Sequence, residues 1–194
     1  IFMVLPRARV SAKRINEVLD EEVSIKSGNF SGNAHEVGTV EFKDVSFRYP
    51  DADEYLLKNI SFRVEKGETV AFIGSTGSGK STLINLVPRL YDATDGEILV
   101  DGVNVKDYKQ SSLHNKIGYV SQKAVIFNGT VNENVSYGEK IIEDNQVKKA
   151  IEVAQAKDFV ESMENEYDTD LAAGGTNISG GQKQRISIAR AIAR

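Results

Sequence analysis

The sequence of 194 residues contains no cysteine and only two histidines, His35 and His114. The lack of thiols excludes a disulfide scaffold and a thiolate zinc site, and two distant histidines do not indicate a histidine metal cluster. Positive charge is not in excess either, because 24 lysines and arginines stand against 28 aspartates and glutamates, a net charge of −4. No broad basic face for nucleic acid is therefore indicated, and a bound polyanion has to be held locally.

Long apolar segments are missing as well. The run Ile1–Leu5 is far shorter than the roughly 20 apolar residues that span a bilayer. Positively charged residues follow it directly, at Arg7, Arg9, Lys13 and Arg14, as they do where a transmembrane helix leaves the bilayer on the cytoplasmic side. The alternative is the first turns of a soluble helix. Because the chain opens at Ile1 and closes at Arg194 within an amphipathic pattern, we expect a piece of a longer protein.

The composition is that of a soluble globular protein, with 40% hydrophobic and 27% charged residues. Helical spacing of apolar residues over 7–22 predicts a helix, and we take 1–23 as a segment of its own. The Ser-, Gly- and Asn-rich stretch 24–37 predicts a linker. One globular domain is therefore expected over 38–194.

The pattern within this domain predicts an α/β fold with an antiparallel β-layer. Val40, Phe42, Val45 and Phe47 indicate a strand element around 40–47, and apolar residues alternate strictly with polar ones over 60–64. Thr69–Ile73 is instead continuously apolar, as in a strand buried on both faces. A helix is expected from Gly79. Further strands are predicted at 98–100 and 117–120, and a further helix at 147–154.

Residues 74–81 (GSTGSGKS) fit the pattern G-x-x-x-x-G-K-[ST] between an expected strand and an expected helix. Glycines in such a loop let backbone N–H groups converge on phosphate oxygens, and the following helix N-terminus adds partial positive charge. Lys80 supplies a full charge for the β- and γ-phosphates, and the Ser81 hydroxyl suits Mg²⁺. The alternative is a Gly-Ser turn that contains a lysine by chance. The flanking strand and helix favour a phosphate loop.

A second helix start has the sequence Ser179-Gly180-Gly181-Gln182. Ser179 as N-cap with Gln182 three residues later predicts a capping box, which is a purely structural role. A cap does not need paired glycines, however, and each glycine costs a helix roughly 1 kcal/mol relative to alanine. Lys183 and Arg185 in the first turn also oppose the helix dipole. A phosphate approaching this helix end would explain both features.

The phosphate loop, then Gln122, then Ser179–Gln182 leading into KQRISIARA together resemble the nucleotide-binding domain of an ATP-binding cassette (ABC) transporter. The resemblance covers 38–194, and residues 1–22 resemble the end of the last transmembrane helix of exporters that carry both domains in one chain. It implies a P-loop NTPase core with an antiparallel β-layer and a helical subdomain, incomplete at its C-terminus. It also implies ATP and Mg²⁺ as ligands.

The resemblance assigns roles to individual residues. Tyr49 matches the aromatic residue on which adenine stacks, and Gln122 matches the glutamine that touches Mg²⁺ and the attacking water. Ser179–Gln182 matches the signature sequence, which meets the γ-phosphate bound by a partner domain, so that function requires a dimer. Residues 127–135 (FNGTVNENV) resemble the stretch that docks near the coupling helices of the transmembrane domain. The phosphate loop and its helix contribute Gly74, Ser75, Thr76, Gly77, Ser78, Gly79, Lys80, Ser81 and Thr82.

Two departures from the family pattern matter for catalysis. The aspartate, the general-base glutamate and the histidine that the family uses for hydrolysis have no match here; Asp101 and His114 come too early, and Asp101 precedes a glycine. The isolated chain is therefore expected to hold ATP with little turnover. In addition, Ala173 stands where many exporters carry a glutamate. Variants of this kind resemble one half of a heterodimeric exporter with a degenerate ATP site.

The sequence thus predicts the ATP-binding part of an exporter at the cytoplasmic face of the cell membrane, with a second nucleotide-binding domain and a transmembrane domain as partners. Alternatives are a non-hydrolysing nucleotide-binding fragment, the degenerate half of a heterodimer, and a soluble ABC ATPase acting on DNA or the ribosome. The absence of a basic face argues against the last.

Overall fold

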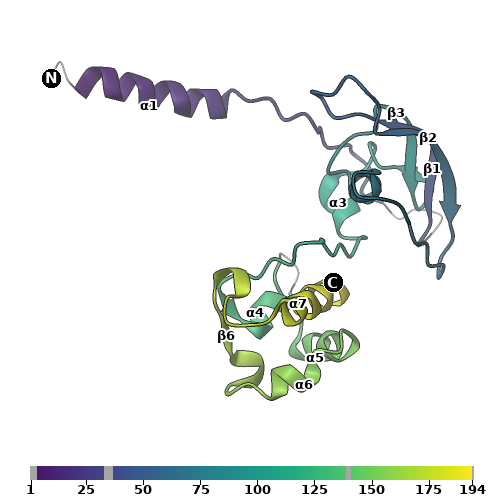
Figure 1. The fold of residues 1–194 in the computed structure, drawn as a ribbon. Helices are drawn as coiled ribbons and strands as arrows, with labels where there is room; N and C mark the ends of the chain where they lie inside the picture. The colour runs from purple at the N-terminus through teal and green to yellow at the C-terminus, as the bar shows by residue number, and fades with distance from the viewer. Residues whose placement is uncertain (1–3, 33–36, 139–140, 194) are drawn as a thin grey trace. The chain divides into compact units, whose positions relative to one another are not determined.

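The computed structural model of the chain describes residues 4–32, 37–138 and 141–193, so His35 lies outside it. The chain forms two compact units, Ile1–Gln110 and Ser111–Arg194 (Figure 1). The first contains an antiparallel sheet and the second consists mainly of helices. This agrees with the predicted α/β class.

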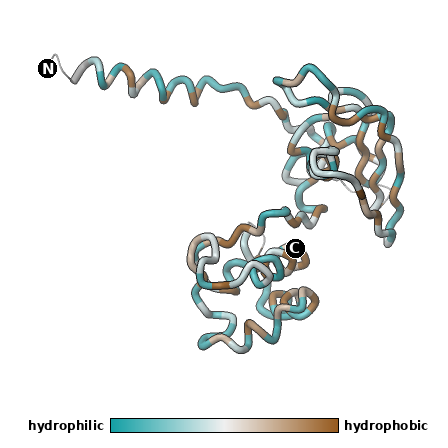
Figure 2. Tube along the Cα trace, viewed as in Figure 1, coloured by the Kyte–Doolittle hydropathy of each residue, from teal (hydrophilic) through white to brown (hydrophobic). Residues whose placement is uncertain are grey.

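Helix α1 (Val4–Leu19) confirms the helix predicted from the apolar spacing. Its side chains from Pro6 onward are exposed, including those of Val10, Ile15, Val18 and Leu19. Figure 2 shows hydrophobic positions recurring among hydrophilic ones along this helix. Among the described residues, no helix combines the length and the apolar character that crossing a membrane requires.

The sheet of the first unit has the strand order β2-β1-β3-β4. Strand β1 (Val40–Phe47) is antiparallel to β2 (Leu57–Val64) on one side and to β3 (Asp95–Val100) on the other, and β3 continues into β4 (Val103–Asn104). The alternating residues predicted to be half-buried, Ile60, Phe62 and Val64, are intermediate in exposure. The core side chains include Phe42, Val45, Phe47, Leu57, Ile98 and Val100.

Asp101 has a structural role in this layer. Its side chain is 5% exposed, and its Oδ1 accepts hydrogen bonds from the backbone N–H groups of Gly38 (2.6 Å) and Thr39 (3.2 Å). Its φ of 53° lies in the left-handed region, which aspartate tolerates better than most residues. From the turn between β3 and β4, the carboxylate therefore fixes the residues just before β1.

The segment Thr69–Ile73 does not form the buried strand that the sequence predicts. It is assigned no strand, and its side chains are exposed, with Ile73 96% and Val70 47% accessible. A strand of this type obtains its ladder hydrogen bonds and its burial from neighbours on both sides. Within residues 4–32, 37–138 and 141–193 no named strand pairs with it. An apolar run alone therefore does not produce a strand here.

The strand predicted at Ile117–Val120 is also absent. Tyr119 and Val120 are 41% and 44% exposed, and the segment is assigned no secondary structure. Gly118 lies so close to helix α7 (Gly180–Ile192) that an added Cβ would come 2.9 Å from the carbonyl oxygen of Ala191. The segment thus lies against α7, but it lacks a pairing strand in the described part of the chain. The physical reason is the same as for Thr69–Ile73.

The second unit is built around a compact apolar core. Its elements are β5 (Gly129–Thr130), α4 (Val131–Val135), α5 (Asp144–Val153), α6 (Lys157–Glu161), β6 (Asp170–Leu171) and α7, with short 3₁₀ turns η1 (Glu166–Asp168) and η2 (Ala173–Gly175). Helix α3 (Gln110–His114) lies at the boundary between the units. The predicted apolar positions of α5, among them Val147, Ala150 and Ile151, are buried against Ile186 and Ala189 of α7. The helical spacing was thus a reliable guide to this core.

Part of the predicted linker is packed rather than free. The N–H of Gly28 donates to Tyr108 O (2.9 Å), that of Phe30 to Asp107 O (2.8 Å), and that of Lys109 to Phe30 O (2.8 Å). The Phe30 ring meets the buried Tyr108 ring edge to face, with centroids 5.2 Å apart. A Cβ at Gly28 would overlap the carbonyl of Asp107. Residues 27–30 therefore form a strap that only glycine at position 28 allows.

We expect Gly28→Ala to release the strap, because the methyl group would meet backbone atoms that cannot turn away. Amide exchange at Phe30 and Lys109 should accelerate at least tenfold, roughly the loss of one to two hydrogen bonds. The matched control is Gly32→Ala, where an added Cβ finds only the Phe30 ring, at an ordinary 3.6 Å. Equal exchange rates in the two variants would show that the close approach at Gly28 does not hold the strap.

Candidate functional site

The predicted phosphate loop lies between the segment Thr69–Ile73 and helix α2 (Lys80–Leu86). Gly77 (φ 84°) and Gly79 (φ 89°) adopt the left-handed conformation, and Gly79 is the N-cap of α2. An added Cβ at Gly79 would lie 2.7 Å from Leu57 Cδ2, so the loop is also pressed against β2. Both glycines are needed for the turn that brings the chain into the helix.

Lys80 points back over this loop. Its Nζ donates hydrogen bonds to the carbonyl oxygens of Gly74 (2.8 Å) and Ser75 (2.6 Å) and to Ser78 Oγ (3.2 Å). The ammonium is thus centred among the residues whose backbone forms the loop. A positive charge held by neutral oxygens in this way remains available to an anion, because no carboxylate is among these partners.

Tyr49 is positioned beside the same helix. Its hydroxyl shares a hydrogen bond with Thr82 Oγ1 (2.9 Å), and its ring packs edge to face against Phe47 (4.9 Å) and Tyr91 (5.4 Å between centroids). Tyr91 was not identified from the sequence, because no local pattern links it to Tyr49, which lies far earlier in the chain. The structure therefore brings Tyr49 together with the phosphate-loop helix.

The remaining predicted site residues lie in the second unit. Gln122 is exposed in an irregular segment next to Ser121, whose Oγ donates to Lys123 O (2.7 Å). The two groups that the sequence assigned to one ATP-bound dimer, the phosphate loop and the Ser179 turn, thus belong to different units of this chain.

The start of α7 contains the predicted capping box. Ser179 Oγ accepts from the Gln182 N–H (3.3 Å), and Gln182 Oε1 accepts from the Ser179 N–H (2.8 Å). An added Cβ at Gly180 or Gly181 would meet nothing within 4 Å. The capping box explains Ser179 and Gln182, but packing within the chain does not explain the two glycines. Because neither glycine has a side chain, the backbone at the N-terminus of the helix is exposed to solvent.

The segment 127–135 contains a second capping box, between Thr130 and Glu133 at the start of α4. Next to it, the exposed rings of Phe127 and Tyr137 are stacked with centroids 4.2 Å apart. We call Phe127 and Tyr137 the aromatic pair.

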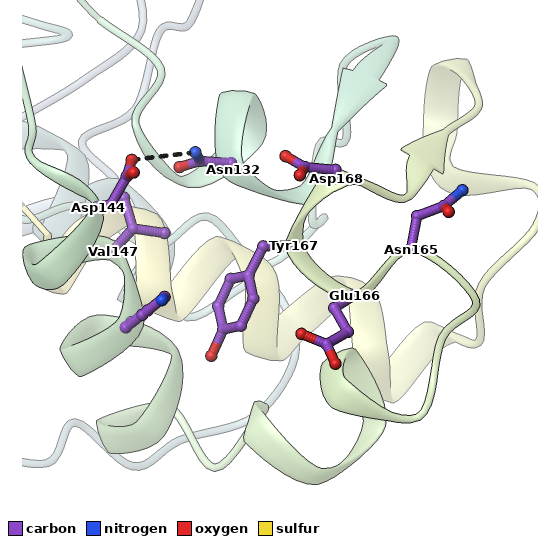
Figure 3. A pocket seen from close by; sticks show the side chains of 8 residues that line it. Asn132, Asp144, Val147, Asn165, Glu166, Tyr167 and Asp168 are labelled. Atoms are coloured by element: carbon purple, nitrogen blue, oxygen red, sulfur yellow. Dashed lines mark hydrogen bonds between the residues drawn. The ribbon is translucent and has the colours of Figure 1, made fainter.

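A separate hollow of about 210 Å³ lies on the second unit, between α5 and η1 (Figure 3). Burial, reinforced by the nearby Glu161, Glu166 and Glu152 carboxylates, raises the pKa of Tyr167 in its wall. Asn132 Nδ2 donates to Asp144 Oδ1 across its rim (3.3 Å). The hollow is polar and contains none of the residues predicted to bind nucleotide or metal, although Asn132 belongs to the stretch 127–135.

Comparison with known proteins places these features in a family. The sequence profile described as ABC transporter matches residues 57–194. A multidrug export ATP-binding/permease protein of Staphylococcus aureus is 46% identical over 176 residues, which are 90% of this chain and 30% of that protein. The ABC transporter ATP-binding protein YfiB of Bacillus subtilis is 43% identical over 195 residues, 100% of this chain and 34% of YfiB.

A solved structure agrees with this assignment. A bacterial Atm1-family ABC exporter with ATP bound superimposes with a TM-score of 0.86 at 32% identity, over 99% of this chain and 34% of that one. The chain thus spans about a third of the length of the proteins it matches. Its phosphate loop, its capped Ser-Gly-Gly-Gln helix and these matches lead to one conclusion: the chain belongs to the ABC transporter family.

Proposed function

We propose that residues 38–194 are the ATP-binding domain of an exporter, which couples MgATP binding and hydrolysis to transport across a membrane. The observation that carries the proposal is the loop Gly74–Ser81, with left-handed glycines and the Lys80 ammonium held over its carbonyls. Such a loop gathers backbone N–H groups and one full positive charge, which is what a triphosphate requires. Tyr49, fixed by Thr82, Phe47 and Tyr91, supplies a ring for the adenine.

The two side chains that the family resemblance assigns to Mg²⁺ also have suitable donor atoms. This ion prefers oxygen ligands, and the Ser81 hydroxyl and the Gln122 side-chain carbonyl are of that kind. Bound ATP supplies the phosphoryl group whose transfer to water releases free energy. In this proposal Lys80 binds the phosphates, Ser81 and Gln122 hold the metal, and Gly74–Thr82 orient the nucleotide.

The glycines of the Ser179 turn support a head-to-tail dimer. A helix N-terminus that is capped by Ser179 and Gln182 and carries glycine at the two positions between them offers partial positive charge to an anion. Because nothing in this chain fills the space next to Gly180 and Gly181, we propose that a second nucleotide-binding domain brings its phosphate there. The stretch 127–135, together with the aromatic pair, then faces the coupling helices of a transmembrane domain.

The names of the relatives support export as the direction of transport, since they describe a multidrug export protein and an Atm1-family exporter. The chain matches about a third of each. We therefore propose that helix α1 leads from the transmembrane part to this domain, at the cytoplasmic face of the membrane. The transported substrate would be selected by that other part.

A second candidate is one half of a heterodimeric exporter, with a degenerate ATP site. Ala173 favours it, because it is exposed in the turn η2 shortly before the signature and places a methyl group where many exporters carry a carboxylate. A stable ATP-dependent homodimer of this chain would contradict this candidate.

Substitution of Lys80 tests the phosphate loop. We expect Lys80→Ala to weaken MgATP binding at least tenfold, about 1.4 kcal/mol, because it removes the only side-chain ammonium directed at the loop in the described chain. Isothermal titration calorimetry on the 194-residue chain measures the dissociation constant. Lys58→Ala, which removes an exposed lysine of β2, serves as the control. Equal affinities in the two variants would refute the proposed site.

Another prediction concerns ATP hydrolysis by this chain alone. Asp101 is committed to the Gly38 and Thr39 amides and so is not available as a general base. We expect phosphate release by the 194-residue chain to be no faster than that of Lys80→Ala. Turnover clearly above that control would mean that a catalytic base exists within these residues.

Alanine at position 181 tests the dimer. Since an added Cβ meets nothing in this chain, Gly181→Ala should not lower the melting temperature, and alanine favours the helix by up to about 1 kcal/mol. A partner's phosphate approaching the backbone would meet the methyl group, so MgATP-dependent dimerisation should weaken severalfold in sedimentation velocity. Unchanged dimerisation would show that the Ser179 turn does not lie at the dimer interface.

A further inference from the structure

Arg190 makes a set of contacts that the proposed function does not use. It lies on α7, nine residues after Gly181 of the Ser179 turn, which corresponds to about 14 Å along the helix. Its Nε donates to Asn134 O (2.7 Å), its Nη1 to Val125 O (2.9 Å) and its Nη2 to Asn134 Oδ1 (3.0 Å). One guanidinium thus binds two separate points of the segment 125–134.

Asn134 spreads this attachment through the segment. Its side chain is only 1% exposed, and its Oδ1 also accepts from the Phe127 N–H (2.9 Å). Its Nδ2 donates to Phe127 O and to Thr130 O, each at 3.0 Å. The amide therefore closes the loop 127–130 upon itself, and Arg190 holds the closed loop to α7.

The same guanidinium supports the aromatic pair. Its carbon lies 5.1 Å from the centroid of the Phe127 ring and 6.0 Å from that of Tyr137. Arginine suits this position because its planar group donates in several fixed directions and stacks on aromatic faces, which lysine does not do. Helices α4 and α7 also pack directly against each other (Figure 1).

From this geometry we propose that Arg190 is a positioning residue that makes α7 and the segment 125–137 move as one rigid piece. We call the contacts of Arg190 and Asn134 the clamp. A displacement of the Ser179 turn, at the N-terminal end of α7, is then transmitted through the clamp to the aromatic pair. The relevance of this coupling to transport rests on the proposed function. The clamp itself is a property of the second unit alone.

Amide exchange measured by NMR on the 194-residue chain tests the clamp without nucleotide. In Arg190→Lys the Phe127 amide should exchange at least about fivefold faster, because a lysine cannot replace the forked, charge-assisted bonds. The buried Ala154 and Ala156 amides, bonded to Ala150 O and Ile151 O, should keep their rates. Arg185→Lys is the matched control, since Arg185 is on the same helix and donates one bond, to Gln155 O.

Three results would overturn the clamp. The first is an unchanged exchange rate of the Phe127 amide in Arg190→Lys, and the second is an equal acceleration in Arg185→Lys. The third is an acceleration that includes the Ala154 and Ala156 amides, because Arg190 would then contribute to stability in general. If Arg190→Lys does not fold, Asn134→Asp replaces it. That variant keeps the acceptors for Arg190 and for the Phe127 N–H, but it places a carboxylate oxygen against the carbonyl oxygens of Phe127 and Thr130 in place of two donated bonds. The repulsion should open the loop 127–130, so the Phe127 amide should again exchange faster while Ala154 and Ala156 keep their rates.

A second readout measures the coupling itself. On addition of MgATP to the unmodified chain, we expect the Tyr137 ring resonances to shift as the dimer forms, and in Arg190→Lys the shift should fall at least twofold while dimerisation persists. A full shift in Arg190→Lys would overturn the coupling. Absence of any MgATP-dependent dimer in the unmodified chain would contradict the proposed function instead, and the exchange rates would still decide the clamp.

Discussion

The pairing of backbone N–H and C=O groups is the constraint on which this structure depends most. Strand β1 satisfies it on both sides, through β2 and β3, and the apolar core of the first unit lies on this ladder. Even the strap at residues 27–30 attaches by backbone bonds to 107–109. Thr69–Ile73 and Ile117–Val120 show the opposite case. Without a pairing strand in the described residues both segments are irregular, and most of their side chains are exposed.

The groups proposed to act on phosphate use the same backbone chemistry. Lys80 is held by the carbonyls of Gly74 and Ser75, and the start of α7 is satisfied by its own capping box, which leaves Gly180 and Gly181 uncovered. Arg190 binds carbonyls as well. Side-chain charge is therefore positioned by main-chain oxygens, so the geometry of each group follows the local conformation and not a network of ion pairs.

Most of the local features could be predicted because their causes are local. The helix at Asp144–Val153, the alternation in β2 and the capping box of Ser179 each follow from the spacing of a few residues. The role of Asp101 was excluded from catalysis by its place in the sequence, but its actual partners, Gly38 and Thr39, lie more than 60 positions away. The contacts of Tyr49 with Tyr91 and of Arg190 with Val125 join distant positions too, so no short pattern reveals them.

The sequence by itself determined the phosphate-loop pattern, the signature pattern and the family, because these depend on residue types at fixed spacing. The tertiary structure decided which apolar segments became strands, since a strand exists only where another strand supplies its hydrogen bonds. It also decided that Gly28 belongs to a packed strap and that Arg190 joins α7 to the aromatic pair. Such contacts arise when the folded backbone brings remote carbonyls within reach of a donor, and spacing along the chain does not contain that information.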